Sequence, residues 1–174
     1  MSSNFCSRTI DWEKYGLVYA GAQKNVGPAG VTVVVVREDL VGKELAQCPE
    51  VMGYKKHYDS PGHCYNTPCC WSIYVAGLNI AHMKEKTLAK IEEEANLKSG
   101  MLYEYIDSSD GYYTNPVDVP FRSRMNVPFR VKKDDEYEAK FLAGAEKLGL
   151  IDLKGHRSVG GCRACLLYTS PSPR

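Results

Sequence analysis

The sequence has no apolar run long enough to span a bilayer, and its first residues lack the basic-then-apolar pattern of a secretory signal. It also has almost no net charge, because 22 Lys and Arg residues are balanced by 21 Asp and Glu residues, a formal charge of +1. We therefore expect no membrane association and no attraction to nucleic acid through overall charge. The Gly-x-x-x-x-Gly-Lys-Ser/Thr spacing of a phosphate-binding loop is absent as well.

The cysteines lack the spacing of a disulfide-bonded scaffold, and their number, seven, is odd. Cys162 and Cys165 match the C-x-x-C pattern, but a zinc site needs a second pair of ligands at similar spacing, and the sequence has none. We therefore predict no metal site and expect reduced thiols in a cytoplasmic protein. Cys69 and Cys70 are interpreted as buried packing residues.

The chain is long enough, at 174 residues with 44% apolar residues, for one ordinary domain or for pieces of two. Residues 37–42 favour a short helical turn, and residues 46–68 an irregular segment rich in turn formers. Apolar periodicity predicts strands at 15–20, 31–36, 112–113, 122–131, 150–153 and 156–165, and helices at 71–84, 90–105 and 134–148. The pattern changes near residue 85, where we place a domain boundary.

A single lysine, Lys24, lies on a glycine-rich turn between the first two predicted strands. The second of these strands is apolar on both faces, as a fully covered sheet requires. An amine at the mouth of such a sheet loses water, and desolvation lowers the pKa of a lysine, which favours Schiff-base chemistry. The alternative is an ordinary solvated surface lysine.

Asn66 and Thr67 end the irregular segment, just before a predicted helix. An amide, a hydroxyl and free backbone N–H groups at a helix N-terminus can bind an anion. The alternative is that Asn66 or Thr67 is simply the N-cap of that helix.

Near the end of the chain, permanent cations and a histidine surround three glycines, and this group includes His156, Arg157 and Arg163. If this segment is extended, Arg157 and Arg163 lie on the same side, because they are an even number of residues apart. Two guanidinium groups suit a ligand with both a phosphate and a carboxylate, whereas the alternative is a basic surface strand. We interpret Arg122 and Arg124 as charges on an exposed strand edge.

Four segments together resemble the phosphoserine aminotransferase family, which depends on pyridoxal 5'-phosphate and has the fold-type-I α/β architecture. They are Gly-Ala-Gln-Lys-Asn at 21–25, Tyr-Asn-Thr-Pro at 65–68, Asn-Val-Pro-Phe-Arg at 126–130 and Gly-His-Arg-Ser-Val-Gly-Gly at 155–161. The resemblance covers nearly the whole chain but only the C-terminal half of the family. It implies the end of the large-domain mixed sheet at 1–84 and a small C-terminal α/β domain at 85–165.

The resemblance implies a role for each candidate site residue. Lys24 resembles the catalytic lysine that bonds the cofactor aldehyde and moves the substrate proton, and Gln23 resembles a contact to the cofactor phosphate. Asn66 and Thr67 resemble residues that reach this phosphate from the neighbouring subunit of a homodimer. The remaining roles are contacts to the substrate phosphate for His156 and Arg157, and to the α-carboxylate for Arg163.

The implied reaction is reversible amino transfer between L-glutamate and 3-phosphohydroxypyruvate, which gives O-phospho-L-serine and 2-oxoglutarate in L-serine biosynthesis. The sequence departs from the family in two ways. In the family, an aspartate that pairs with the cofactor ring directly precedes the stretch that begins here at Met1, and it is absent from this sequence. In addition, residues 166–174 do not continue the family pattern and look like a non-native tail. We therefore expect a truncated, inactive fragment with an aggregation-prone open edge at 31–36. The alternatives are a non-catalytic chain that only dimerises, and another fold-type-I enzyme.

Overall fold

The structure is a computed structural model that describes residues 2–132 and 134–166. The chain divides into two compact units. Unit 1 comprises Met1–Phe5 and Thr9–Lys86, and unit 2 comprises Cys6–Arg8 and Thr87–Arg174. The predicted domain boundary after residue 84 stays a prediction about the longer protein. Apart from Leu166, the predicted non-native tail lies outside the described residues.

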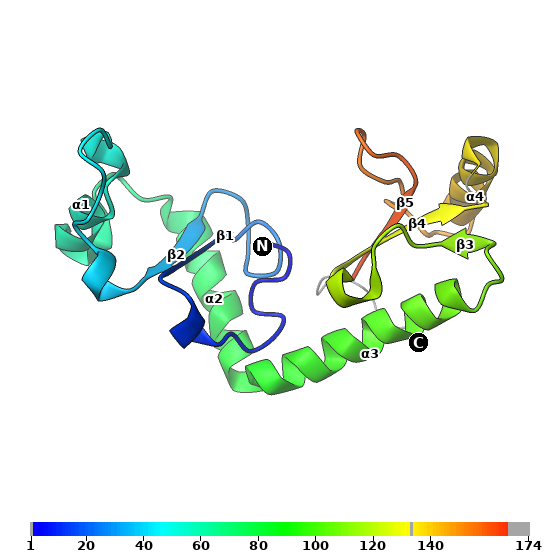
Figure 1. Cartoon of the computed structure of the whole chain (residues 1–174), viewed down its shortest axis with the longest axis horizontal. Coiled ribbons are helices and arrows are strands. Elements are labelled where there is room, and N and C mark those ends of the chain that lie inside the picture. Colours follow the sequence, from blue (N-terminus) through cyan, green and yellow to red (C-terminus); the bar gives the residue numbers. More distant parts are fainter. Residues whose placement is uncertain (1, 133, 167–174) are drawn as a thin grey trace. The chain divides into compact units, whose positions relative to one another are not determined.

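Unit 1 contains an antiparallel pair of strands and two helices (Figure 1). Its elements are β1 (Leu17–Gly21), β2 (Thr32–Val36), α1 (Tyr54–Asp59) and α2 (Cys70–Lys86). Leu17 lies opposite Val36, and Gly21 lies opposite Thr32. The two strands and the long helix confirm the predictions from apolar periodicity.

The strand pair is not covered on both faces, so that prediction is wrong for the described chain. Val35 on β2 is 41% exposed and Tyr19 on β1 is 66% exposed. Helix α2 also presents large apolar side chains to solvent, with Trp71 at 74% exposure. Cys69 and Cys70, expected to be buried, are exposed.

The segment at 46–68, predicted to be irregular, contains helix α1. A salt bridge between Lys55 and Asp59, 2.8 Å across one helical turn, stabilises this short element. The predicted helical turn at 37–42 is confirmed by a 3-10 turn at Glu38–Leu40. Further 3-10 turns occur at Trp12–Lys14, Glu50–Met52, Pro61–His63 and Val119–Phe121.

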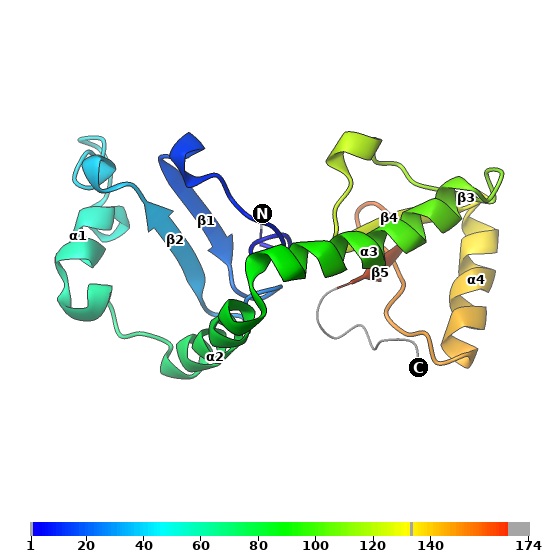
Figure 2. The same ribbon diagram turned by 90° about the horizontal axis from the view of Figure 1, so that it is seen from below.

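Unit 2 packs two helices against a three-stranded antiparallel sheet, as Figures 1 and 2 show. Its elements are α3 (Leu88–Asp107), β3 (Tyr113–Thr114), β4 (Asn126–Val131), α4 (Asp135–Lys147) and β5 (Cys162–Cys165). The strand order β3-β4-β5 places β4 in the centre. An α/β architecture is therefore confirmed.

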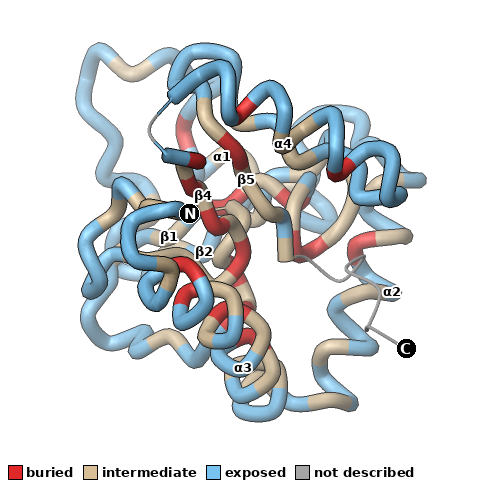
Figure 3. The backbone as a smooth tube through the Cα atoms, turned by 90° about the vertical axis from the view of Figure 1, so that its right-hand side faces the viewer, coloured by how far each residue is buried: buried red, intermediate tan, exposed pale blue. Residues whose placement is uncertain are grey.

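The core of unit 2 lies on one face of β4. Alternate residues of this strand, Val127, Phe129 and Val131, are buried (Figure 3), because successive side chains of a strand point to opposite faces. Ile106 from α3 packs into the same cluster, and Phe141 from α4 stacks edge-on against Phe129 with ring centroids 5.7 Å apart. The central strand is thus fixed by packing from both helices.

Helix α4 begins and ends where capping chemistry predicts. The Asp134 carboxylate accepts hydrogen bonds from the backbone N–H groups of Glu136 and Tyr137, at 2.7 and 3.3 Å. Gly149 follows the helix with φ +80°, a conformation that favours glycine at the C-terminal end. These local signals explain why the sequence predicted this helix almost to the residue.

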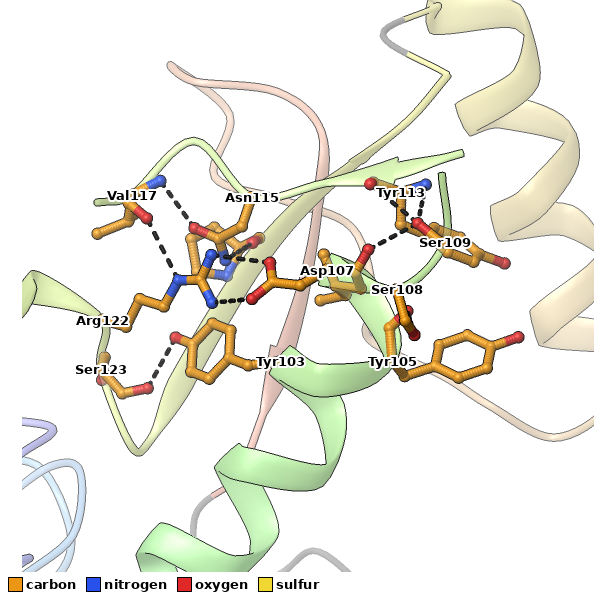
Figure 4. A network of polar contacts seen from close by, with 12 residues as sticks. Tyr103, Tyr105, Asp107, Ser108, Ser109, Tyr113, Asn115, Val117, Arg122 and Ser123 are labelled. Atoms are coloured by element: carbon orange, nitrogen blue, oxygen red, sulfur yellow. Dashed lines mark hydrogen bonds and ion pairs between the residues drawn. The ribbon is translucent and has the colours of Figure 1, made fainter. Parts of the chain in front are cut away.

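Arg122 does not lie on a strand edge, so its sequence interpretation is wrong. Its guanidinium forms a two-point ion pair with Asp107 at 2.6 and 2.9 Å and lies 4.7 Å from the ring centre of Tyr103 (Figure 4). Strand β4 begins only at Asn126, and the Ser123 hydroxyl accepts the backbone N–H groups of Met125 and Asn126 at this point. Arg124 is also paired, with Glu92.

No helix in the parts of the chain at 2–132 and 134–166 has both the length and the apolarity that crossing a membrane requires.

Candidate active site

The turn that carries Lys24 closes the β1–β2 pair through backbone hydrogen bonds. Ala22 N–H donates to the Val31 carbonyl at 2.8 Å, which extends the strand ladder by one pair. The N–H groups of Lys24 and Gly27 both donate to the Ala22 carbonyl, at 2.6 and 2.7 Å. Ala22 and Val26 have no exposed surface, so the backbone on both sides of the lysine is buried.

Asn25 ties this turn to two other segments of unit 1. Its side-chain amide donates to the Phe5 carbonyl at 2.8 Å, and its own carbonyl accepts from the Asn79 side chain of α2 at 2.9 Å. Both contacts use groups that cannot rotate away without leaving a polar atom unpaired. The backbone of Lys24 is therefore held in place by its neighbour.

Unlike the side chain of Asn25, those of Lys24 and Gln23 remain available. Lys24 is half-buried, and within residues 2–132 and 134–166 its Nζ makes no hydrogen bond or ion pair. Gln23 beside it is exposed. The sequence pattern predicts a Lys24 side chain shielded from water, whereas in the described chain this side chain is only partly shielded.

Asn66 and Thr67 are exposed and precede helix α2. The helix begins at Cys70, and the Cys69 carbonyl already accepts the N–H of Ile73 at 3.1 Å. The alternative interpretation, in which Asn66 or Thr67 is the N-cap, is therefore wrong. Both side chains remain available for another group.

The structure does not bring Asn66 and Thr67 to Lys24. Near its N-terminus, α2 is fixed to residues 29–30, where the Ser72 hydroxyl donates to the Ala29 carbonyl at 2.9 Å. The Lys24 turn instead meets the helix at Asn79. Seven residues separate these two contacts, about 10 Å of helix at 1.5 Å per residue, so the Lys24 turn contacts the middle of α2, whereas Asn66 and Thr67 precede its N-terminus.

Residues 155–161 form a compact turn rather than a strand. Gly155 N–H donates to the Gly161 carbonyl at 2.9 Å, and the N–H groups of Val159 and Gly160 both donate to the His156 carbonyl. The predicted strand at 156–165 is confirmed only over β5. Arg157 and Arg163 therefore do not lie on one side of a single extended segment, and that prediction is wrong.

The preceding segment at 150–153 is not a strand either. Only Lys154 forms an isolated bridge, with Cys162. The backbone is diverted just before, at Asp152, whose φ of +60° lies in the left-handed region. The apolar side chains of this segment point to no core, since Leu150 and Ile151 are exposed.

Ser158 fixes the ring of His156, a role that the sequence analysis missed. The Ser158 hydroxyl lies 2.7 Å from His156 Nδ1, and the Ser158 backbone N–H donates to the same nitrogen at 3.3 Å. A ring nitrogen that accepts an N–H is not the protonated one in neutral imidazole, so Nε2 carries the proton. The spacing His-x-Ser was the only signal in the sequence.

Arg163 lies on β5, opposite Pro128 of β4. Its backbone N–H donates to the Leu153 carbonyl at 2.7 Å. Its Nε atom is buried without a hydrogen-bond partner, and no other buried side-chain nitrogen or oxygen in the described part of the chain lacks one. A buried donor without an acceptor is costly, so this guanidinium is suited to an acidic ligand.

The other arginines near the sheet are already neutralised. Arg122, Arg124 and Arg130 each pair with a carboxylate. Within residues 2–132 and 134–166, Arg157 and Arg163 have no acidic partner. In unit 2, the Nε2–H of His156 and the guanidinium groups of the exposed Arg157 and the half-buried Arg163 therefore remain as donors for an anion with more than one acidic group.

The thiols offer no metal centre in the described residues. All seven cysteines are free, and no group of three or more Cys, His, Asp or Glu side chains there is arranged to hold a metal ion.

The sequence profile of the family described as Aminotransferase class-V matches residues 1–170. The chain is 49% identical over 172 residues to a phosphoserine aminotransferase from Laribacter hongkongensis, covering 98% of this chain and 47% of that protein. It is 49% identical over 170 residues to a phosphoserine aminotransferase from Drosophila melanogaster, covering 95% and 46%. The chain spans about half the length of these curated relatives.

Solved structures give the same result for the fold. A phosphoserine aminotransferase studied for radiation damage of its Schiff base matches with a TM-score of 0.91 at 40% identity, covering 98% of this chain and 47% of that one. A phosphoserine aminotransferase with bound PLP from Trichomonas vaginalis matches with a TM-score of 0.88 at 39% identity, covering 98% and 49%. The predicted fold class, part of a fold-type-I transferase, is confirmed.

Proposed function

The chain belongs to the aminotransferase class-V family, and from this premise we propose that it is half of a pyridoxal-phosphate-dependent phosphoserine aminotransferase. The reaction is reversible amino transfer between L-glutamate and 3-phosphohydroxypyruvate, which gives O-phospho-L-serine and 2-oxoglutarate in L-serine biosynthesis. One observation carries the proposal beyond the names of the relatives: Arg163 has a buried donor without a partner, next to a turn that bears His156 and Arg157. Both amino-acid substrates have an α-carboxylate, and one also has a phosphate.

The residues of unit 1 fit the cofactor. When bound, pyridoxal phosphate supplies an aldehyde that condenses with amines and a ring that accepts electrons from the neighbouring carbon. Lys24 offers an amine that has no partner in the described part of the chain, on a backbone that Asn25 holds in place, and we assign the bond to the cofactor to this amine. Gln23 is the adjacent exposed side chain, and we assign it a contact to the cofactor phosphate.

The substrate contacts divide by charge. Arg163 holds the α-carboxylate that every substrate shares, because a guanidinium binds a carboxylate with two parallel hydrogen bonds. His156 donates from Nε2 to the phosphate, since Ser158 occupies Nδ1, and Arg157 adds a fixed positive charge. Once released from the cofactor, the Lys24 amine would take the proton from the substrate Cα and deliver it to carbon C4′ of the cofactor.

We assign Asn66 and Thr67 to the cofactor phosphate of a neighbouring subunit in a homodimer. The support is the separation within one chain, where Lys24 and the start of α2 are fixed to different positions along the helix. In a site shared between subunits, the exposed side chains of Asn66 and Thr67 would contact the cofactor phosphate of the partner and not that of their own chain.

We place the protein in the cytoplasm. All seven cysteines are free, and structural disulfides are typical of secreted proteins instead.

Two alternatives follow from the half length of the chain. In the first, the chain does not catalyse the reaction and acts at most as a dimerisation partner that supplies Asn66 and Thr67 to an intact copy. In the second, it belongs to another fold-type-I enzyme. The first alternative predicts a stable mixed dimer on co-expression with a full-length partner, and the second predicts transfer from alanine in preference to phosphoserine.

The test uses the full-length protein that contains this sequence, supplied with pyridoxal phosphate and treated with borohydride. Mass spectrometry should locate the reduced cofactor on Lys24, and Lys24→Ala should lose both the adduct and the amino transfer. Lys14→Ala is the matched control, because Lys14 is an exposed lysine paired with Asp11. A reduced adduct in the Lys24→Ala protein contradicts the assignment.

A further inference from the structure

The Asn-Val-Pro-Phe-Arg segment at 126–130 ends in an arginine that the proposed reaction does not use. We propose that Arg130 is a positioning residue, which braces the turn at 155–161 so that His156 and Arg157 can hold a phosphate. This inference rests on the proposed function for the identity of the ligand. The brace itself is a property of unit 2 alone.

Arg130 lies directly against the glycines that close the turn. A Cβ atom added at Gly161 would lie 2.8 Å from Arg130 Cδ, closer than any side chain tolerates without a shift. A Cβ atom at Gly160 would lie 3.5 Å from Arg130 Nη1. The arginine stem and its guanidinium thus form the surface on which this backbone rests.

Two carboxylates from the first turn of α4 hold the guanidinium in place. Arg130 Nε lies 2.6 Å from Glu138 Oε1, and Nη2 lies 2.9 Å from Asp135 Oδ1. Glu138 is only 6% exposed and also accepts the backbone N–H of Val131 at 3.3 Å. Because its charge is already neutralised by two carboxylates, Arg130 acts through the turn and not as a ligand of the substrate.

The turn at 155–161 needs such a support because its glycine-rich backbone has many accessible conformations when it is not ordered. Gly160 and Gly161 both have positive φ, +75° and +70°. Glycine loses more conformational entropy on ordering than any other residue, so a segment with several glycines is costly to fix. The start and end of the turn are tied to the sheet, by the Lys154–Cys162 bridge and by the pairing of Cys162 with Phe129. Arg130 adds a side-chain support beneath the two glycines between these anchors.

Arg163 is held by strand pairing and not by Arg130, so loss of the Arg130 side chain should affect the turn at 155–161 more than Arg163. Its position follows from the β4–β5 ladder, in which Cys162 pairs with Phe129 and Arg163 with Pro128. Removing the Arg130 side chain leaves this backbone pairing intact. Loss of the brace should therefore harm phosphate binding while it spares carboxylate binding.

The first experiment compares Arg130→Gln with Arg122→Gln in the full-length protein, with the two half-reactions measured separately. Arg122 is the matched control, because it is an arginine of the same unit with a two-point carboxylate pair but no contact to the turn. Arg130→Gln should lower kcat/KM for O-phospho-L-serine about tenfold, mainly through KM, and change that for L-glutamate less than about twofold. Arg122→Gln should leave the ratio of the two unchanged.

The second experiment needs no activity. Amide hydrogen exchange of the full-length protein without cofactor or substrate should become at least about fivefold faster at residues 155–161 in Arg130→Gln, and remain unchanged there in Arg122→Gln. Arg130→Lys provides a milder variant if the glutamine protein does not fold, since an ammonium retains the charge but does not span both carboxylates with a fork.

The outcomes separate this inference from the proposed function. Equal losses in both half-reactions, or unchanged exchange at 155–161 in both Arg130 variants, would overturn the brace. If the wild-type protein does not react with phosphoserine but exchange still accelerates at 155–161 in Arg130→Gln, the proposed function is wrong and the brace stands.

Discussion

Gly155 and Gly160 approach each other so closely that no side chain fits between them: a Cβ atom on Gly155 would overlap the Gly160 carbonyl oxygen. The contact partner is backbone, which cannot rotate away as a side chain can. The turn with His156 and Arg157 therefore depends on glycine at position 155 for space.

Gly155→Ala should open this turn and lower the free energy of unfolding by about 2 kcal/mol, as overpacking typically does. Chemical denaturation of the chain measures the change. Gly144→Ala is the control, because Gly144 lies in α4 with nothing within 4 Å of its added Cβ, and alanine there should stabilise the helix by up to about 1 kcal/mol. An unchanged stability in Gly155→Ala would contradict the observed backbone approach.

Cys162 should make stability fall at alkaline pH. Burial, with a smaller contribution from the Glu138 charge, raises the pKa of the Cys162 thiol from 9.0 to about 11. The unfolded chain loses this proton first, so the stabilisation is fully present below pH 9 and is lost as pH rises towards 11, by up to about 2 kcal/mol.

The measurement is the unfolding free energy at several pH values between 8 and 10.5 for the wild type and Cys162→Ala. The variant should show a shallower decline. Cys165→Ala, at the exposed end of the same strand, should decline as the wild type does. Parallel curves for all three proteins would show that Cys162 does not cause the effect.

Arg163→Ala and His156→Ala should differ in which substrates they affect. In the full-length protein, the first should raise KM about tenfold or more for both glutamate and phosphoserine, because both lose a charged hydrogen bond. The second should raise KM mainly for phosphoserine, and Ser158→Ala should have a smaller effect in the same direction. Steady-state kinetics of each half-reaction decides, and a His156→Ala loss equal for both substrates is the contrary result.

The exposed edge of β2 should cause the isolated chain to associate. Val35 is 41% exposed on a strand that pairs, within the described residues, with β1 alone. Val35→Lys places a charge on this edge and should slow the rise of light scattering on warming. Val33→Lys places the same charge at a half-buried position, and we expect it to destabilise the chain and speed association. Faster association with Val35→Lys would argue against the edge as its cause.

Much of the fold could be predicted from the sequence, because helix caps, apolar periodicity and glycine turns depend on residues close together in the chain. Helix α4 follows from the Asp134 cap, the apolar periodicity and Gly149, all of which act over a few residues. The β1–β2 pair and the turn with Lys24 follow from two apolar runs separated by glycines. Family motifs then indicated the candidate site residues, whose roles stay predictions.

Only the tertiary structure decided which charges are neutralised and which are free. Nothing near Arg122 in the sequence indicates Asp107, and nothing near Arg163 indicates that its Nε is buried without a partner. The predicted strand at 156–165 is limited to Cys162–Cys165, because residues 155–161 bond to one another in a turn in which Gly160 and Gly161 have positive φ. This turn packs against Arg130 of β4. Capping and periodicity depend on neighbours in the chain, whereas burial and ion pairing depend on segments that meet only after folding.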